Sequence, residues 1–428
     1  MKQNLRTGFT AFQECLSKTI SMNKYFLSFI IQLFVVQSVF AQNTGIEKSS
    51  TDSTSSNKTP TIQGISDGSL SGLSERIDVN FLLRSSVDFP SGASNQASVN
   101  LNEARMELRG DVTPDLSFRI RYRLNRSFAQ NSLDNAPGAV DHANLTYRFG
   151  TGKKWHLTAG KQSASVGSWE FDKNPTFEYQ YTEYVNRQLN LFLLAMKLGY
   201  DVTENHTFQL QLHNTSNSNF NTIYNTTGYN TDGLRPSKTP FGLYVAWLGN
   251  LLDEKWQTFY SYNISQFARG KTDHAVSIGN QVVLDRFKAY LDLQSTNMSV
   301  DYPNIGSPAV NTFMAPTPGF TPVFLQDINY KTAVLRVDYE FIPKWFVTAK
   351  GFYETASHRK DSEIGDNFRE HTGLLAGLEY KPIASQEMRL FSYYYYNTSR
   401  YNNAVGVSNP NQKLHLFSVG VLYFVNAL

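Results

Sequence analysis

Cysteine is nearly missing from this chain of 428 residues, and long apolar runs are scarce. The single cysteine is Cys15, so the chain can form neither an internal disulfide nor a thiolate metal cluster. Beyond residue 41, the longest uninterrupted apolar run is Leu191–Met196. A membrane-spanning helix needs about 20 apolar residues. The sequence after residue 41 therefore predicts no such helix.

The start of the chain has the features of an export signal. A basic residue and an apolar run over residues 25–34 are followed by Val39 and Ala41, at the −3 and −1 positions of a small-residue cleavage site. This order is typical of a secretory signal peptide. Residues 1–41 are therefore predicted to be removed on export, with Met22 as an alternative natural start. An uncleaved anchor is the other interpretation, but the run is shorter than the ~20 residues that a spanning helix needs.

Neither sign of charge dominates the chain once the signal peptide is removed. The whole chain has 39 basic and 36 acidic residues. Removing residues 1–41 takes away four basic residues and one acidic residue, which leaves 35 of each. A neutral chain without a basic domain argues against a nucleic-acid partner. Residues 42–72 begin with a stretch rich in Ser, Thr and Asn and are predicted to be a flexible periplasmic tether.

Residues 73–428 carry a different pattern, in which apolar and polar residues alternate. Aromatic residues are abundant, with 24 Tyr and 30 Phe in the chain. In Leu116–Leu124, Phe118 and Ile120 share one face, and Arg119 and Arg121 share the other. Such segments of about ten residues are typical of transmembrane β-barrels. The pattern predicts sixteen strands, at residues 76–84, 101–110, 116–125, 141–149, 154–161, 189–200, 206–214, 241–249, 255–265, 274–284, 286–294, 331–341, 344–354, 371–381, 387–397 and 413–425.

The predicted connections alternate in length. Even-numbered connections are short, and odd-numbered ones are long except for residues 266–273. An even strand count with short turns at one end and long loops at the other is the pattern of outer-membrane barrels. A closed antiparallel barrel also leaves no strand edge in lipid. The predicted fold is therefore all-β, a transmembrane antiparallel barrel in the outer membrane of a Gram-negative bacterium. A secreted soluble β-protein gives no reason for this alternation.

Four of the five tryptophans lie beside predicted short turns, on the apolar face of their strands. Aromatic residues gather where a barrel wall meets the membrane interface. The four are therefore predicted to face lipid as a girdle at the periplasmic rim: Trp155, Trp247, Trp256 and Trp345. The alternative is that they belong to an ordinary protein core.

Motifs of catalysis and of cofactor binding are missing. The sequence has no GxSxG, HExxH, P-loop, GxGxxG or CxxC pattern. Its eight histidines are scattered, and His206 and His213 lie on opposite faces of one predicted strand. The sequence therefore predicts no catalytic residue, cofactor or metal ion. A hydrolase with a Ser/His site on the barrel wall remains an alternative.

Three runs resemble the phosphate-selective porin O and P family: LNEARMELRGDVTPDLSFRIRYRLNRS (101–127), SLDNAPGAVDHANLTYRF (132–149) and LTAGKQSASVGSWEFDKNP (157–175). The resemblance implies a sixteen-stranded, trimeric porin that takes up small anions such as phosphate. The last strand, Ser418–Val425, resembles the terminal signal read by the barrel-assembly machinery, although three further residues follow it.

Charged residues occupy the polar face of the second and third predicted strands. The arginines are Arg105, Arg109, Arg119, Arg121 and Arg123, and the glutamates are Glu103 and Glu107. The arginines either line the pore and bind anions through charge-assisted forks, or form a salt-bridge ladder that braces the wall. A turn centred on Thr113 predicts three cross-strand pairs: Glu107 with Arg119, Glu103 with Arg123, and Arg105 with Arg121. The last pair would lack a carboxylate and would set the ion preference.

The third long connection, residues 162–188, carries six large aromatic residues. Exposing so much apolar surface to water is costly, at about 25 cal/mol per Å². The connection is therefore predicted to fold into the barrel and constrict it, and it brings four residues there: Trp169, Glu170, Asp172 and Lys173. The alternative is that it packs on other external loops or on a neighbouring subunit.

These observations predict a passive porin, in contact with outer-membrane lipid, that prefers small anions such as phosphate and is not an enzyme. Three alternatives stay open. One is a channel specific for sugars or other small solutes, in which stacked aromatics such as Tyr393 and Tyr395 contribute. The others are an outer-membrane enzyme, and a structural or adhesion protein whose lumen is filled.

Overall fold

The computed structural model describes residues 77–92, 95–130, 133–172, 177–358, 360–361 and 363–427. All of them belong to one compact unit, residues 61–428. The predicted signal peptide (1–41), the predicted tether (42–72) and Lys173 lie outside the described residues.

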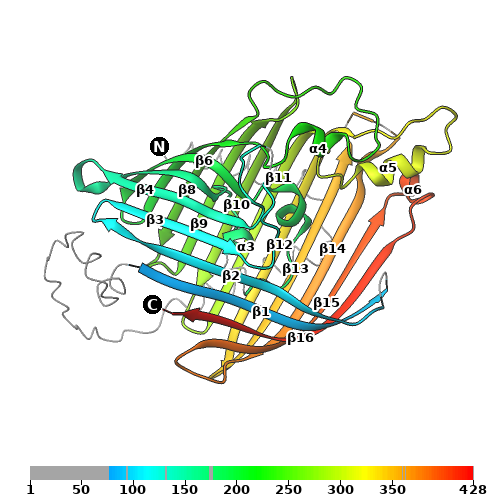
Figure 1. The fold of residues 1–428 in the computed structure, drawn as a ribbon. Coiled ribbons are helices and arrows are strands. Elements are labelled where there is room, and N and C mark those ends of the chain that lie inside the picture. Colours follow the sequence, from blue (N-terminus) through cyan, green and yellow to red (C-terminus); the bar gives the residue numbers. More distant parts are fainter. Residues whose placement is uncertain are drawn as a thin grey trace, which may run out of the picture. The chain divides into compact units, whose positions relative to one another are not determined.

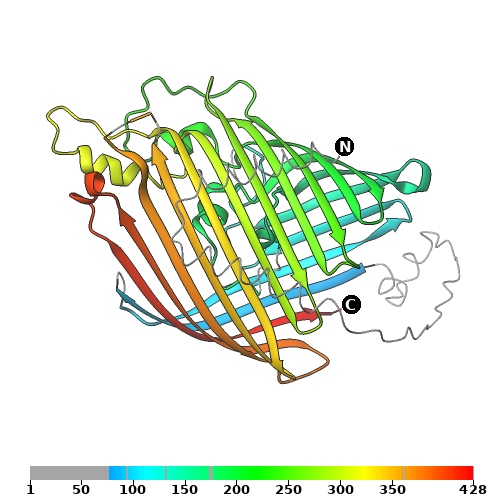
Figure 2. The same ribbon diagram turned by 180° about the vertical axis from the view of Figure 1, so that it is seen from behind.

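The described residues form sixteen strands in one closed antiparallel barrel (Figure 1; Figure 2 shows it from behind). Each strand pairs with its neighbours in sequence, and β1 pairs with β16 to close the wall. Closure satisfies the backbone polar groups that lipid cannot. The predicted fold class is confirmed. The strands are β1 (Ile77–Gly92), β2 (Ser98–Thr113), β3 (Leu116–Arg123), β4 (Val140–Phe149), β5 (Trp155–Ser163), β6 (Phe192–Thr203), β7 (His206–Asn214), β8 (Phe241–Leu251), β9 (Trp256–Gln266), β10 (Thr272–Val283), β11 (Phe287–Val300), β12 (Gln326–Ile342), β13 (Trp345–His358), β14 (Gly365–Tyr380), β15 (Glu387–Tyr401) and β16 (Gln412–Asn426).

Short helices lie in the connections between strands. They are η3 (Thr151–Lys153), α3 (Trp169–Asp172), η4 (Tyr184–Gln188, a π-helical turn), α4 (Phe220–Tyr224), α5 (Ser307–Met314) and α6 (Asn403–Gly406). None of the helices in the described part of the chain combines the length and apolar character that crossing a membrane requires.

Several strands extend further at their external ends than the sequence predicts. The predicted long connection over residues 85–100 is wrong, because β1 continues to Gly92 and β2 begins at Ser98. Polar side chains hold this extension: Asp88 accepts hydrogen bonds from Asn100 and Ser418, each from a neighbouring strand. The backbone ladder therefore continues beyond the residues that the alternation of apolar and polar residues assigned to the strands.

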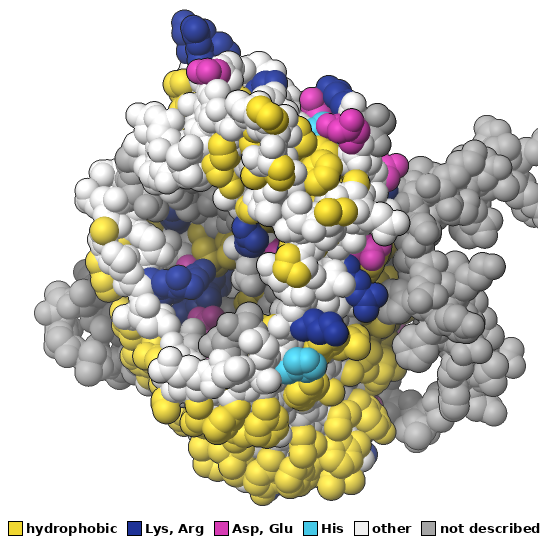
Figure 3. Space-filling model, turned by 90° about the vertical axis from the view of Figure 1, so that its right-hand side faces the viewer, with side chains coloured by type: hydrophobic (Ala, Val, Ile, Leu, Met, Phe, Trp, Pro, Cys, Tyr) yellow, Lys and Arg dark blue, Asp and Glu magenta, His cyan; other side chains and the backbone are white. Residues whose placement is uncertain are grey.

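The two faces of the barrel differ as predicted. The outer face carries exposed apolar side chains, including Leu145, Met196, Phe208, Leu212 and Val245. Figure 3 shows a continuous apolar surface on the outside and a hollow whose depth contains Lys and Arg side chains. The alternation of apolar and polar residues therefore separates a lipid-facing surface from a charged lumen.

The four predicted girdle tryptophans lie near the ends of their strands, and aromatic residues oppose three of them. Trp155 lies opposite both Phe149 and Tyr200, Trp247 opposite Phe208 and Tyr260, and Trp345 opposite Tyr380. Trp256 begins β9 and shares its face with Tyr260 and the exposed Tyr262. Trp155 is itself exposed, and an exposed side chain two or more positions away shares the face of each of the others: Val245 for Trp247, Tyr262 for Trp256 and Val347 for Trp345. The predicted outward orientation is therefore confirmed.

We expect these tryptophans to lie at the lipid interface. In variants that keep one tryptophan and replace the others with Phe, fluorescence from position 155, 247, 256 or 345 is expected to be quenched by lipids brominated near the headgroup. A variant that keeps only Trp169, which lies inside the barrel, is the matched control and is expected to resist this quenching. Quenching of the four by aqueous iodide, and not by brominated lipid, would contradict the assignment.

Candidate functional site: an arginine-lined cavity in the lumen

The connection between β5 and β6 lies inside the barrel over its described residues, 164–172 and 177–191, which together form the inserted segment. Asp292 of β11 anchors its beginning. The Asp292 carboxylate accepts hydrogen bonds from the Ser168 hydroxyl (2.9 Å) and from the backbone N–H groups of Trp169 (3.1 Å) and Glu170 (2.9 Å). Because β11 lies across the lumen from β5, a segment that follows β5 and bonds β11 must cross the interior of the barrel. The prediction that this connection enters the barrel is confirmed.

A buried ammonium group holds the middle of the segment. Lys350 of β13 donates hydrogen bonds to Glu170 (2.6 Å), to Glu178 (2.9 Å) and to the backbone oxygen of Gln180 (2.6 Å). Arg336 of β12 adds an ion pair with Glu178 at 3.1 Å. These charged side chains are almost completely buried. Removing one partner of a buried ion pair leaves an uncompensated charge at a high energetic cost, so this network fixes the position of the segment.

A third contact holds the end of the segment. Arg369 of β14 forms two hydrogen bonds with Glu183, at 2.5 and 2.9 Å, and Glu354 of β13 accepts from the backbone N–H groups of Glu183 and Tyr184. Burial raises the pKa of Glu183, but the charge and hydrogen bonds of Arg369 outweigh burial and hold this pKa below its ordinary value. Glu183, Glu354 and His371 lie close enough to share a metal ion. Arg369 already supplies a cation there, so the group is an ion pair that holds the segment.

The structure separates the residues predicted at the constriction. Asp172 lines the cavity described next. Trp169 packs edge-on against an aromatic ring of β9. Glu170 is fully buried against Lys350, so the prediction that it faces the pore is wrong. Its partner lies 180 residues away along the chain, and no local pattern reveals such a contact.

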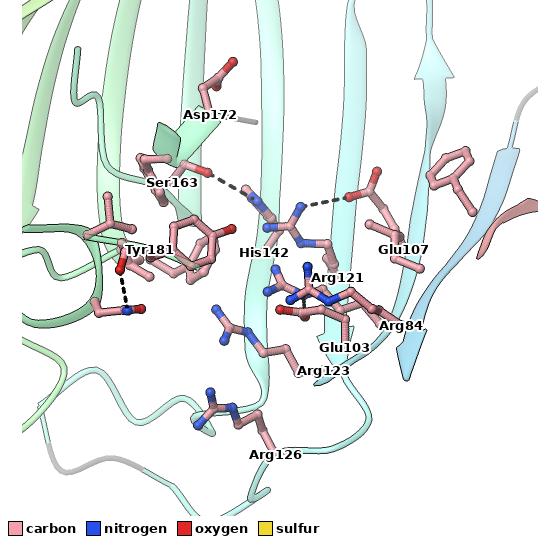
Figure 4. Close-up of a pocket in the computed structure, with 18 of the residues that line it drawn as sticks. Arg84, Glu103, Glu107, Arg121, Arg123, Arg126, His142, Ser163, Asp172 and Tyr181 are labelled. Atoms are coloured by element: carbon pink, nitrogen blue, oxygen red, sulfur yellow. Dashed lines mark hydrogen bonds and ion pairs between the residues drawn. The ribbon is translucent and has the colours of Figure 1, made fainter. Parts of the chain in front are cut away.

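A cavity of about 470 Å³ lies between the inserted segment and strands β1–β4 (Figure 4). A second cavity, of about 490 Å³, extends toward the turn between β2 and β3. Five residues line both cavities and mark the level at which they meet: Arg109, Arg119, His142, Ser163 and Asp172. A solute that moves from one cavity to the other passes these side chains.

Positive charge dominates the first cavity. Among its described lining residues are seven arginines: Arg84, Arg105, Arg109, Arg119, Arg121, Arg123 and Arg126. The carboxylates that line it are Glu103, Glu107 and Asp172. Figure 4 shows guanidinium groups reaching into the cavity from the wall opposite the inserted segment. All five arginines predicted from the sequence line this cavity, together with Arg84 from β1 and Arg126 beyond the end of β3.

The predicted register between β2 and β3 is wrong by two residues. The observed pairs are Arg105 with Arg123, Glu107 with Arg121, and Arg109 with Arg119. A register shift in the turn, between Asp111 and Thr113, moves its centre. The predicted ion pair between Glu107 and Arg119 exists nevertheless, as a diagonal contact at 2.8 Å. Glu103 bonds Arg105 at 2.7 Å instead of Arg123.

Asp141, which sequence reasoning missed, lies at the centre of the arginine group. Its carboxylate accepts from Arg105 (2.8 Å), Arg121 (3.1 Å) and Arg123 (2.7 Å), and it is 1% exposed. The predicted pair of Arg105 and Arg121 without a carboxylate is therefore wrong. The cause is a β-bulge: Arg121 pairs with His142 and the next residue of β3 pairs with Val140, so Asp141 is inserted between them. Bulges break the strict alternation of side chains, and a parity argument cannot place such a residue.

A closed barrel with an apolar outer face, a charged lumen and an inserted segment defines the class of outer-membrane porins. The chain belongs to the phosphate-selective porin O and P family, whose sequence profile matches residues 78–423. It is therefore a porin of the outer membrane of a Gram-negative bacterium, and family and fold are those of a channel rather than an enzyme. No curated protein sequence matches the chain.

Solved structures with the same fold include three porins or channels, each aligned over 82% of this chain. The outer membrane channel DcaP of Acinetobacter baumannii has a TM-score of 0.57 at 10% identity and is covered over 97% of its length. The anion-selective porin from Comamonas acidovorans has a TM-score of 0.52 at 9% identity and 99% coverage. OmpF of Salmonella typhi has a TM-score of 0.51 at 12% identity and 97% coverage. At these identities the similarity concerns the fold alone.

Asp141→Asn removes the carboxylate that three arginines share. We expect the zero-current potential in a salt gradient to move toward anions, because one negative charge is lost beside the lumen. We also expect the free energy of unfolding to fall, by up to about 3 kcal/mol, because three guanidinium groups then repel one another. Asp253→Asn, in the exposed turn between β8 and β9, is the control and should change neither quantity. Equal effects of the two variants would contradict the central role of Asp141.

Proposed function

We propose that the channel prefers anions and that phosphate is one of the small anions it passes. The observation that carries the proposal is the composition of the cavity, where seven arginines face three carboxylates among the described lining residues. Asp141 adds one further negative charge behind the arginines. A net positive lumen raises the local concentration of anions and lowers that of cations.

The arginines of β3 form a path through the cavity. Arg119, Arg121 and Arg123 occupy alternate positions of one strand, and therefore lie about 7 Å apart along it. Arg126 continues this row at the external end, and Arg109 stands opposite Arg119 at the level where the two cavities meet. At this spacing an anion can move from one guanidinium group to the next and remain in a region of positive electrostatic potential.

The arginines keep donor groups for a solute. Each guanidinium has five N–H donors. The hydrogen bond described for Arg123 runs through Nε to Asp141, and Figure 4 shows its terminal nitrogen atoms directed into the cavity. Guanidinium groups that are held in place by a carboxylate are well suited to bind an oxyanion through paired hydrogen bonds. Bracing of the wall and binding of anions are therefore compatible roles for the same side chains.

A sugar-specific channel would need aromatic rings exposed in the lumen, and the two tyrosines considered for that role are not exposed. Tyr393 and Tyr395 are both about 95% buried. Tyr393 packs against Tyr179 of the inserted segment, with ring centroids 5.0 Å apart, and accepts a hydrogen bond from Gln180. Tyr393 therefore holds the segment against the wall, Tyr395 packs near Phe352 of β13, and neither presents a stacking surface to a solute.

The anion preference is expected to depend on Arg121 and Arg123. In a planar bilayer with a KCl gradient, the wild-type zero-current potential should indicate anion selectivity. The anion selectivity should weaken between 0.1 M and 1 M salt, because the Debye length falls from ~10 Å to ~3 Å. Arg121→Gln and Arg123→Gln should each reduce the selectivity, by similar amounts because both arginines bond Asp141. Arg286→Gln, in the exposed turn between β10 and β11, is the control. A cation-selective wild type would refute the proposal.

We further propose that the porin is a homotrimer. Strands β3, β5 and β7 have only eight or nine residues, whereas β12 has seventeen. At ~3.4 Å per residue and a tilt of ~40°, the short strands span about 20 Å, less than the ~25 Å apolar band of a membrane barrel. The wall is therefore lowest at β3–β7. A neighbouring subunit packed against these strands would cover the part of the apolar band that they do not span.

We expect semi-native electrophoresis to give a species of three times the monomer mass that separates on heating. Leu145→Arg and Met196→Arg, which put charge on the exposed outer face of β4 and β6, are expected to reduce the trimer. Leu374→Arg, on the outer face of β14, is the matched control on the tall side of the wall. Equal loss of the trimer in all three variants would contradict the proposed location of the contact.

A further inference from the structure

The inserted segment turns its glutamates away from the arginine wall. Glu170 and Glu178 bond Lys350, and Glu183 bonds Arg369, all on the opposite side of the lumen. Among the described residues of the segment, Asp172 is the one carboxylate that lines the arginine cavity. The face that the segment presents to the arginines is therefore only weakly acidic.

Most side chains on that face are apolar or aromatic, and Gln180 and Asn186 add uncharged polar groups. The cavity lining includes Phe171, Tyr181, Val185 and Leu191 from the segment, and Phe192 from the first position of β6. Figure 4 shows the Tyr181 ring on the side of the cavity that faces Arg121 and His142. The cavity thus has two unlike walls, one in which guanidinium groups predominate and one in which aromatic rings and aliphatic side chains predominate.

The two walls meet at Phe192. The guanidinium carbons of Arg121 and Arg123 each lie 5.3 Å from the centre of the Phe192 ring. Cations at this distance from an aromatic face are attracted to it. The contact brings a cationic edge and an apolar surface within the length of one small organic molecule.

From this juxtaposition we propose that the cavity selects organic anions in which an oxyanion head is attached to a flat apolar body. The inference rests on the proposed anion preference and narrows its substrate class. An inorganic oxyanion uses the arginines but leaves the apolar wall in contact with water. A solute with both parts binds the arginines through its head and covers apolar surface with its body, which adds a favourable contribution in proportion to the area covered. The volume of about 470 Å³ lies within the range of small-molecule sites.

Benzenesulfonate and methanesulfonate test the inference in wild-type protein in a planar bilayer. Both are permanent anions with the same head, and they differ only in the phenyl body. Each is added to a chloride solution, and the concentration that halves the chloride current is measured. We expect benzenesulfonate to act at a concentration about tenfold lower, equivalent to 1.4 kcal/mol. Inorganic phosphate, measured in the same way, is expected to need a higher concentration than benzenesulfonate.

Variants of Phe171 assign the effect to the apolar wall. Phe171→Ser should remove most of the difference between the two sulfonates, while Phe171→Leu, which keeps an apolar side chain, should retain it. Phe89→Ser is the matched control, since Phe89 is an exposed aromatic residue on the outer face of β1. Single-channel conductance is recorded in each variant, because an unchanged value shows that the segment has stayed in place.

The outcomes separate this inference from the proposed function. Equal half-blocking concentrations for the two sulfonates, in a channel whose zero-current potential is anion-selective, would overturn the organic-anion inference and leave the anion preference intact. A wild type that is not anion-selective would overturn the proposed function itself. A phenyl advantage that survives Phe171→Ser at unchanged conductance would also overturn the inference, because the apolar wall would not be its source.

Discussion

The lumen depends on one buried cation, the ammonium group of Lys350. It joins two carboxylates and a backbone oxygen of a segment that begins on the other side of the barrel. A lysine without water is stable only when such partners surround it, so the segment and the wall fix each other. The network also compensates the negative charges of Glu170 and Glu178, because Lys350 pairs with both of them. Apart from Asp172, the described side chains of the segment that line the arginine cavity are uncharged, and the positive character of the cavity follows from this arrangement.

The barrel itself was predictable, because lipid imposes strict rules on its wall. Each residue of a strand such as β3 faces either lipid or lumen, and the alternation of Phe118 and Ile120 with Arg119 and Arg121 follows directly. External strand ends were less predictable. In the extension of β1, Val87 and Phe89 still alternate with polar residues, but the following Pro90, Ser91 and Gly92 end the pattern and are typical of a turn, although the backbone ladder includes them.

The site was predictable in its composition and not in its geometry. Parity identified the five lumenal arginines. Arg84 was missed, although the same argument could have found it, because Arg84 shares the inward face of β1 with the buried Asn80. Parity failed at Asp141, because a bulge inserts this residue, and at Glu170, because its partner is distant in sequence. Both failures concern carboxylates: Asp141 joins three of the arginines, and Glu170 holds the inserted segment to Lys350. Composition therefore indicates the sign of a pore charge, whereas three-dimensional contacts decide how it is distributed.

The sequence distances within the lumen also bear on how the porin is made. Tyr179 bonds Glu379 at a separation of 200 residues, and Glu183 bonds Arg369 at a separation of 186. Contacts between such remote partners form late, because the intervening chain must first be ordered. During synthesis and export the inserted segment precedes the strands that supply Asp292, Lys350 and Arg369. The width of the channel therefore depends on strands that follow the segment by more than a hundred residues, because these strands hold the segment in place.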